Sequence, residues 1–471
     1  MTAEAVPKGG SLRRTMGLTD TTLFLVVAVV SPRWIASAAA AGPSALVIWL
    51  IALAGFFVPM AWAVIELSSR HPDEGGIYVW TRRAFGDFAG FMTGWMYWAS
   101  NLVYFPGLLY FAVGNALLIA GPGGAALNDS AAWYIGASLV ALAIALVLNL
   151  VGLGVGKWLH NLGGVATWVP VALLVALAAA AWMRGGTATE FTPATLAPAT
   201  GLRDIVFWST IAFAFSGMEA ASMLGGEIAA AKRNIPRAIL LSGAVITAIY
   251  VLGTAAVLVT LPQREVSALQ GFGQAIERAG RVVGVPSAGV IAALFLTISN
   301  IGGVGAWLTA AARLPFVAGL DRYLPPAFAW LHPRWGTPVV ALLVQAAGTA
   351  VFIVLGQAGA TVKGAYDVLV GMGVIVYFIP YLFMFAAYIR LQREPAGPEV
   401  RRTPGGSPVA ILLGVVGFAT TAISIVLAVV PPSDEQHPTL AVLKIVGSSL
   451  ALVVLGAWLY SRGKARRAAT T

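Results

Sequence analysis

The sequence has little of what most soluble proteins and many enzymes depend on. It has no cysteine, which excludes disulfides and thiolate metal sites. Its four histidines are too widely spaced for a helical two-histidine metal motif. Charged residues make up 10% of the 471 residues, against about 25% in soluble domains. We therefore expect neither a resident metal nor a cofactor, and too little polar surface for a protein dissolved in water.

Apolar residues take the place of the missing charges. The hydrophobic share is 59% and the mean hydropathy is +0.84. Because a helix that crosses a bilayer needs about 20 mostly apolar residues, these values predict an all-α polytopic membrane protein with about 12 transmembrane helices. The predicted spans are 19–41, 44–68, 86–120, 131–153, 158–183, 203–229, 237–260, 285–318, 338–356, 364–390, 407–430 and 439–461.

The placement of the basic residues predicts the orientation. If the N-terminus is inside, 21 of the 29 Lys and Arg residues fall on the cytoplasmic side and seven on the outer side. This asymmetry follows the positive-inside rule and predicts a multi-pass protein of the inner (cytoplasmic) membrane with both termini cytoplasmic. It also accounts for the net charge of +10, so we expect membrane lipids as partners and no nucleic acid.

Two spans are interrupted near mid-depth by helix-breaking and charged residues. Span one contains Ser31-Pro32-Arg33-Trp34, and span six contains Phe215-Ser216-Gly217-Met218-Glu219. Proline removes a backbone donor and glycine weakens a helix. A charge at the bilayer centre costs about 2.5–3.5 kcal/mol or more. Such breaks persist only where they are buried or line a cavity, and they indicate the central site of a transporter.

The two interrupted spans lie five spans apart. This spacing predicts one transport domain over 1–471, built from two inverted five-helix halves, 19–183 and 203–390. Two extra helices follow over 407–461, with a cytoplasmic N-terminal segment at 1–18 and a cytoplasmic tail at 462–471.

Three stretches resemble the amino acid permeases of the amino acid–polyamine–organocation (APC) superfamily. The first runs from Glu66-Leu67 through Arg70, Pro72, Gly75-Gly76 and Tyr78 to Gly94-Trp95. The second covers 213–239, from Phe213 through Gly217 and Glu219 to Asn234-Ile-Pro-Arg, and the third covers 313–338. The Arg-Trp pair in span one is most similar to the subgroup of glutamate/γ-aminobutyrate antiporters.

The resemblance implies the inverted-repeat fold of the bacterial leucine transporter, with alternating access around a site between spans one and six. In the family, a glycine-rich break in span one offers backbone donors to the substrate carboxylate, whereas this sequence has Ser31–Trp34 there. Some members place a coupling lysine in span five, where this sequence has Thr167. Proton coupling through such a lysine is therefore not expected.

The candidate substrate-binding residues belong to the two breaks: Ser31, Pro32, Arg33, Trp34, Phe215, Ser216, Gly217 and Glu219. Arg33 has three open roles: bidentate contact with a substrate carboxylate, a clamp to Glu219, or snorkelling and gating. Glu219 has three as well: binding a substrate amine, pairing with Arg33, or carrying a proton. Phe215 is either a lid over the substrate or a packed core residue.

The candidate gating and coupling residues lie nearer the helix ends. Glu66, Arg70 and Glu227 are predicted to act at an inner gate or to fix loops. Asn300, with Thr297 and Ser299, could form a sodium site or only helix-packing hydrogen bonds. Asp367 is a candidate for an outer gate.

We conclude from the sequence that the chain is a secondary active transporter, a permease or antiporter, of amino acids or close derivatives. No nucleotide-binding Gly-x-x-x-x-Gly-Lys-Ser/Thr pattern occurs, so a solute or ion gradient is expected to drive it. The alternatives are an organic-amine or polyamine carrier of the same fold and, less favoured, a non-transporting membrane sensor. No set of residues typical of an intramembrane enzyme is present. The sequence does not identify the solute or its exchange partner. It also leaves open whether a proton or a sodium ion is coupled to transport, and what the oligomeric state is.

If Arg33 binds the substrate carboxylate, Arg33→Lys is expected to abolish or strongly weaken uptake while the protein still inserts and purifies. A lysine keeps the charge but lacks the planar fork that contacts both carboxylate oxygens. Uptake into proteoliposomes measures the effect, and near-normal kinetics in this variant would exclude the contact.

Overall fold

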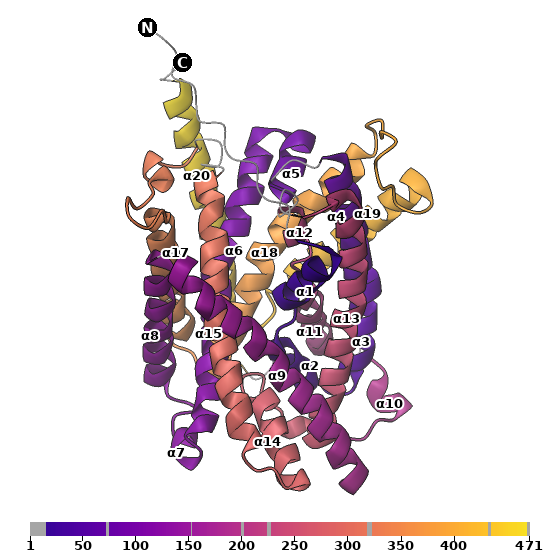
Figure 1. Cartoon of the computed structure of the whole chain (residues 1–471), viewed down its shortest axis with the longest axis vertical. Helices are drawn as coiled ribbons and strands as arrows, with labels where there is room; N and C mark the ends of the chain where they lie inside the picture. Colours follow the sequence, from indigo (N-terminus) through magenta and orange to yellow (C-terminus); the bar gives the residue numbers. More distant parts are fainter. Residues whose placement is uncertain are drawn as a thin grey trace.

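Helices make up the bundle that surrounds the two interrupted segments (Figure 1). The computed structural model describes residues 16–71, 75–151, 153–198, 202–223, 228–317, 323–431 and 435–468. Over these ranges the backbone forms helices and no strand, apart from an isolated bridge between Met16 and Ile228. The predicted all-α class is confirmed.

Ten helical stretches in the described ranges are long and apolar enough to cross a membrane. They are α3–η1–α4 (Ser44–Arg70), α6 (Asp87–Ile119), α8 (Ala131–Leu150), α9 (Leu153–Gly185), α13 (Ala231–Thr260), α15 (Ala288–Val317), α17 (Val339–Gln357), α18 (Val362–Leu391), α19 (Gly406–Leu427) and α20 (Pro438–Ala468). The pair α1 (Leu18–Val29) and α2 (Pro32–Ala40) adds an eleventh span if it counts as one. The chain is a polytopic membrane protein, and the number twelve stays a prediction.

Two amphipathic helices were not predicted, because their sequences lack a long apolar run. One is α5 (Ile77–Phe85), and the other is α14 (Gly271–Val283), which buries Phe272, Ala275, Ile276 and Ala279 at helical spacing. They lie at opposite ends of the bundle (Figure 1), which we call the α5 end and the α14 end. The C-terminal end of α20 lies at the α5 end.

Pro32 begins a new helix rather than merely bending an old one. It is the first residue of α2, a position where its missing N–H and fixed φ carry little cost. Ser31 is the N-cap, in extended conformation, and α2 departs from α1 by 46°. The first break is therefore a two-residue extended segment, Val30–Ser31, between two half-helices.

Gly217 makes the second break possible. Helix α11 (Leu202–Ala214) ends before it, the short α12 (Ala220–Met223) follows it, and its φ is +115°. This backbone conformation favours glycine, because a Cβ strains it. A Cβ there would also lie 3.2 Å from Cγ2 of Val29, the last residue of α1 before the first break. The second break therefore packs against the end of α1, next to the first break.

Tyr250 of α13 joins the ends of α1 and α11. Its hydroxyl lies 2.7 Å from the Val29 carbonyl oxygen and 3.0 Å from that of Ala214, and shares its proton between them. The ring is fully buried and stacks on Trp49 of α3. Because a helix end leaves carbonyls without intrahelical donors, this hydroxyl supplies a donor that both breaks need.

We expect Tyr250→Phe to lower stability by about 1–3 kcal/mol, because two buried carbonyl oxygens lose their donor. Thermal unfolding of the purified protein in detergent measures the change. An unchanged unfolding midpoint would show that the hydroxyl does not stabilise the breaks.

Candidate functional site

A small cavity lies between the two breaks. It has a volume of about 30 Å³, which is room for about two or three water molecules. Its walls come from α1–α2, α6, the end of α11, α15 and α18, so residues far apart in sequence meet there. They are Ala28, Val29, Trp34, Asn101, Tyr104, Phe213, Ala214, Ser216, Gly217, Trp307 and Tyr377.

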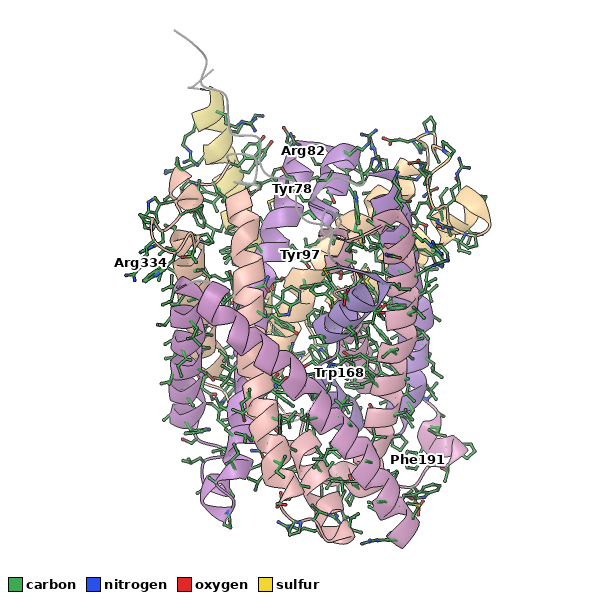
Figure 2. All side chains as sticks on the ribbon, in the orientation of Figure 1. Tyr78, Arg82, Tyr97, Trp168, Phe191 and Arg334 are labelled. Atoms are coloured by element: carbon green, nitrogen blue, oxygen red, sulfur yellow. The ribbon has the colours of Figure 1, made fainter. Side chains whose placement is uncertain are left out.

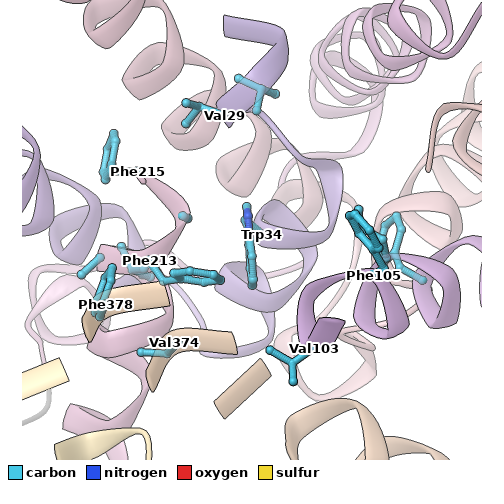
Figure 3. Close-up of a cluster of buried hydrophobic side chains, with 14 of the residues drawn as sticks. Val29, Trp34, Val103, Phe105, Phe213, Phe215, Val374 and Phe378 are labelled. Atoms are coloured by element: carbon cyan, nitrogen blue, oxygen red, sulfur yellow. The ribbon is translucent and has the colours of Figure 1, made fainter. Parts of the chain in front are cut away.

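Five of the eleven residues that line the cavity are aromatic. Phe213 meets Trp34 edge to face, with ring centroids 5.4 Å apart, and meets Tyr377 in the same way at 5.5 Å. Figure 3 shows Phe213 and Trp34 side by side, with Phe215 lying apart from them. A ligand in this cavity would therefore contact mainly ring faces and edges, with few polar groups fixing its orientation.

Phe215 does not occupy the place expected of a lid. It is fully buried and packs against Trp49, Phe57 and Tyr250. Phe213, two residues earlier and still inside α11, lines the cavity instead. Of the two readings of Phe215, the structure supports the packed core residue.

Arg33 lies directly behind the cavity wall. Its guanidinium carbon is 4.0 Å from the centre of the Trp34 ring and 4.3 Å from that of Tyr104, two rings that line the cavity. The residue is 2% exposed, and its Nε is buried without a hydrogen-bond partner in the described structure. Desolvated cation–π contacts of about 2 kcal/mol each offset much of the burial cost, but rings supply no acceptor for Nε–H.

Glu219 is fully buried, and three tyrosine hydroxyls surround its carboxylate. Tyr97 of α6 and Tyr377 of α18 donate to Oε1, at 2.9 and 2.7 Å, and Tyr381 of α18 donates to Oε2. The backbone N–H of Gly217 also donates to Oε2, at 3.1 Å. Figure 2 places Tyr97 in the interior of the bundle. These bonds offset the desolvation of the carboxylate.

The two buried charges lie on opposite sides of the cavity. Glu219 contacts Tyr97, whereas Arg33 contacts Tyr104, seven residues further along α6 toward the α14 end. At 1.5 Å per residue this separates the two contacts by about 10 Å along the helix. Both residues are described, and no ion pair joins them. The clamp between Arg33 and Glu219 is not observed.

Glu66 and Arg70 fix a loop at the α5 end. The Arg70 guanidinium donates twice to Glu66 Oε1, at 2.7 and 3.0 Å. Glu66 Oε2 accepts from the backbone N–H and the hydroxyl of Thr403, at 3.0 and 2.7 Å. Arg70 also donates to the Glu394 carbonyl oxygen. Of the two roles predicted, these contacts support fixing the connection between α18 and α19.

Further ion pairs hold the same connection. Arg83 at the end of α5 pairs with Glu394 at 3.1 Å, and Lys232 at the start of α13 pairs with Glu399. The hydrogen bond from Lys232 lowers the pKa of Glu399 below its usual value. The loop therefore ties α4, α5 and α13 together at this end of the bundle.

The remaining candidates lie outside the cavity. Asn300 is buried and donates to Leu296 O in its own helix, and Asp367 pairs with Lys363 at 3.4 Å. Thr167 and Ser299 are hydrogen-bonded across α9 and α15 at 2.5 Å. Thr297 donates to Ala293 O, also within its helix. Glu227 lies outside the described residues.

Sequence reasoning missed most of the aromatic residues of the site. Phe213, Trp307, Tyr97, Tyr377 and Tyr381 were not among its candidates. Tyr377 and Tyr381 are spaced i, i+4, which puts both hydroxyls on one helix face. A buried carboxylate in a neighbouring span needs such donors, and this spacing is a signal that could have found them.

The chain is similar to one protein family over most of its length and to individual bacterial transporters. The profile of a family described as amino acid permease matches residues 13–451. An uncharacterized transporter of Legionella pneumophila is 26% identical over 459 residues, 96% of this chain and 97% of its own. A probable agmatine/putrescine antiporter of Lactococcus lactis is 23% identical over 91% of this chain and 90% of its own. An uncharacterized transporter of Mycobacterium bovis is 28% identical over 88% of this chain and 87% of its own.

If Glu66 only fixes the loop, Thr403→Val should lower stability by about 1.5–3 kcal/mol, the worth of a hydrogen bond to a charged group. The substrate concentration at half-maximal uptake should not change. Thr421→Val is a matched control, because that hydroxyl donates within its own helix to Gly417 O. Normal stability with altered half-saturation in Thr403→Val would indicate a gate instead.

Proposed function

This chain belongs to the amino acid permease family, and from that premise we propose that it carries an amino acid or close derivative through the cavity between the two helix breaks. The family and the transporter relatives make it a secondary transporter of amino acids or amine derivatives and not an enzyme. The resemblance to this family that the sequence analysis found is confirmed. The solute, the path and the residues that bind it form the proposal.

The observation that carries the proposal is the buried, unneutralised Arg33. A buried charge costs several kcal/mol unless it is paired, and no described carboxylate pairs with this guanidinium. Its Nε–H lacks an acceptor, and the two rings that cover it are walls of the cavity. A substrate carboxylate that reaches Arg33 when Trp34 or Tyr104 swings aside would supply the missing anion and acceptor.

The opposite side of the cavity suits an ammonium group. Ala28, Val29 and Ala214 line it at the last turns of α1 and α11, where helix dipoles place negative partial charge. Glu219 lies beyond them on the side of Tyr97. An amino acid would then bind with its amino group toward Glu219 and its carboxylate toward Arg33. Ser216 and Gly217, which line the cavity, would contact the bound amino acid.

Alternating access needs a barrier on each side of the cavity. Toward the α5 end, the hydrogen bonds of Glu219 join the second break to α6 and α18. Toward the α14 end, Trp34, Arg33 and Tyr104 join the first break to α6. At about 30 Å³ the present cavity is too small to hold an amino acid. We propose that substrate enters when one set of contacts separates and leaves when the other does.

The membrane placement and the repeat organisation belong to the same proposal. The excess of 21 basic residues over seven supports a cytoplasmic α5 end, cytoplasmic termini and the inner membrane. The breaks in α1–α2 and α11–α12 support two inverted halves, 19–183 and 203–390, followed by helices over 407–461. A proton, a sodium ion or a second solute would drive the cycle.

An organic amine is the second candidate, because one relative is a probable agmatine/putrescine antiporter. In that case Glu219 would be the main substrate contact. Its carboxylate already accepts from three tyrosine hydroxyls and a backbone N–H, and Arg33 would repel a dication. These contacts favour the amino acid.

Counterflow into proteoliposomes tests the proposal. Vesicles preloaded with unlabelled amino acids and γ-aminobutyrate are offered each labelled solute in turn, without an imposed ion gradient. We expect accumulation of one class of amino acid, because exchange needs only a shared site. Protein-free liposomes are the control. Accumulation of putrescine alone, in putrescine-loaded vesicles, would favour the amine, and no accumulation by folded protein would contradict transport.

A further inference from the structure

A second, larger hollow lies on the lateral surface at the α5 end. It has a volume of about 450 Å³ and runs between the end of α5, the last turns of α18 and the facing side of α19. Ala386 of α18 and Ala419 of α19 leave space between the larger side chains. Its lining residues are Phe85, Ala386, Ile389, Arg390, Arg393, Val415, Phe418 and Ala419. We call it the α18–α19 groove.

The groove combines apolar walls with two arginines. Val415 is 51% exposed, Phe85 40% and Phe418 39%, although no polar group on these side chains favours water. Since α18 and α19 are membrane-spanning helices, such side chains face lipid. The α18–α19 groove therefore opens toward acyl chains along its length and toward headgroups at the end of α18, where the arginines lie.

Arg390 and Arg393 differ from their neighbours in having no carboxylate partner among the described residues. Arg70 pairs with Glu66 and Arg83 with Glu394, a few residues away. Arg390 only lies over the ring of Phe85, at 5.3 Å. Arg390 is in the last turn of α18, and Arg393 is in the turn that directly follows it, where its backbone N–H donates to the Arg390 carbonyl oxygen. Both side chains are exposed and line the same groove, so both guanidinium groups can reach one anion. A long arginine side chain near a helix end extends toward the membrane surface to keep its charge in water. This tendency does not explain why two arginines without a carboxylate partner line the same apolar hollow.

We propose that the α18–α19 groove binds an anionic phospholipid from the membrane leaflet at the α5 end. The headgroup phosphate lies between Arg390 and Arg393, because a guanidinium fork matches phosphate oxygens. An acyl chain lies in the hollow against Phe85, Val415 and Phe418. Basic pockets between transmembrane helices are suited to anionic headgroups. A soluble anion would leave the apolar part of the groove unfilled.

Native mass spectrometry of the delipidated full-length protein tests the site. The probes are phosphatidylglycerol and phosphatidylcholine with the same acyl chains, added separately over a range of concentrations. We expect one phosphatidylglycerol to bind with a preference of about thirtyfold over phosphatidylcholine, given two favourable charge contacts. Equal retention of the two lipids would overturn the proposal.

Two variants separate the headgroup contact from the hollow. R390Q/R393Q should lose the preference for phosphatidylglycerol, whereas R334Q/R462Q, which removes two exposed arginines outside the groove, should keep it. Ala419→Phe fills the hollow and should weaken retention of both lipids without changing any charge. Thermal unfolding shows that each variant is folded. Equal loss in both double variants, or full retention in Ala419→Phe, would contradict a site at this groove.

Discussion

Backbone groups freed by the two helix breaks must find hydrogen-bond partners inside an apolar bundle, because a bilayer offers no water to satisfy them. The hydroxyl of Tyr250 serves the carbonyls of both Val29 and Ala214. Gly217 brings the second break against the first, since its φ of +115° and its missing Cβ allow the close approach to Val29. The cavity lies between these segments, with Ala28 and Val29 of α1 on its wall together with Ser216 and Gly217 of the second break.

The two buried charges are stabilised by different chemistry, and this difference bears on function. Glu219 accepts hydrogen bonds from three hydroxyls and one backbone N–H, so its carboxylate is satisfied without a ligand. Arg33 is held by aromatic faces, which attract a cation but accept no directed hydrogen bond. This difference supports the proposal that Arg33, rather than Glu219, is the charge that a substrate anion would satisfy.

The two helix breaks and their charged residues could be predicted from the sequence. Pro32, Arg33, Gly217 and Glu219 interrupt long apolar runs, and local chemistry alone marks those positions as breaks with buried charge. Glu66 and Arg70, four residues apart, are in register for the ion pair that the structure contains. The amphipathic α14 was not predicted, because its apolar residues are spaced for one face and never form a run.

Contacts between side chains on different helices could not be predicted from the sequence. The sequence singles out both Arg33 and Glu219, but their joining or separation depends on how α6 is placed between them, through Tyr104 and Tyr97. Phe213 and Phe215 are equally apolar, and only the point where α11 ends sends the first to the cavity and the second to Trp49. By itself the sequence determined the membrane class, the two breaks and the buried charges, because composition and backbone chemistry are local properties. The tertiary structure alone decided which side chains meet at the cavity, because contacts between distant helices depend on packing in three dimensions.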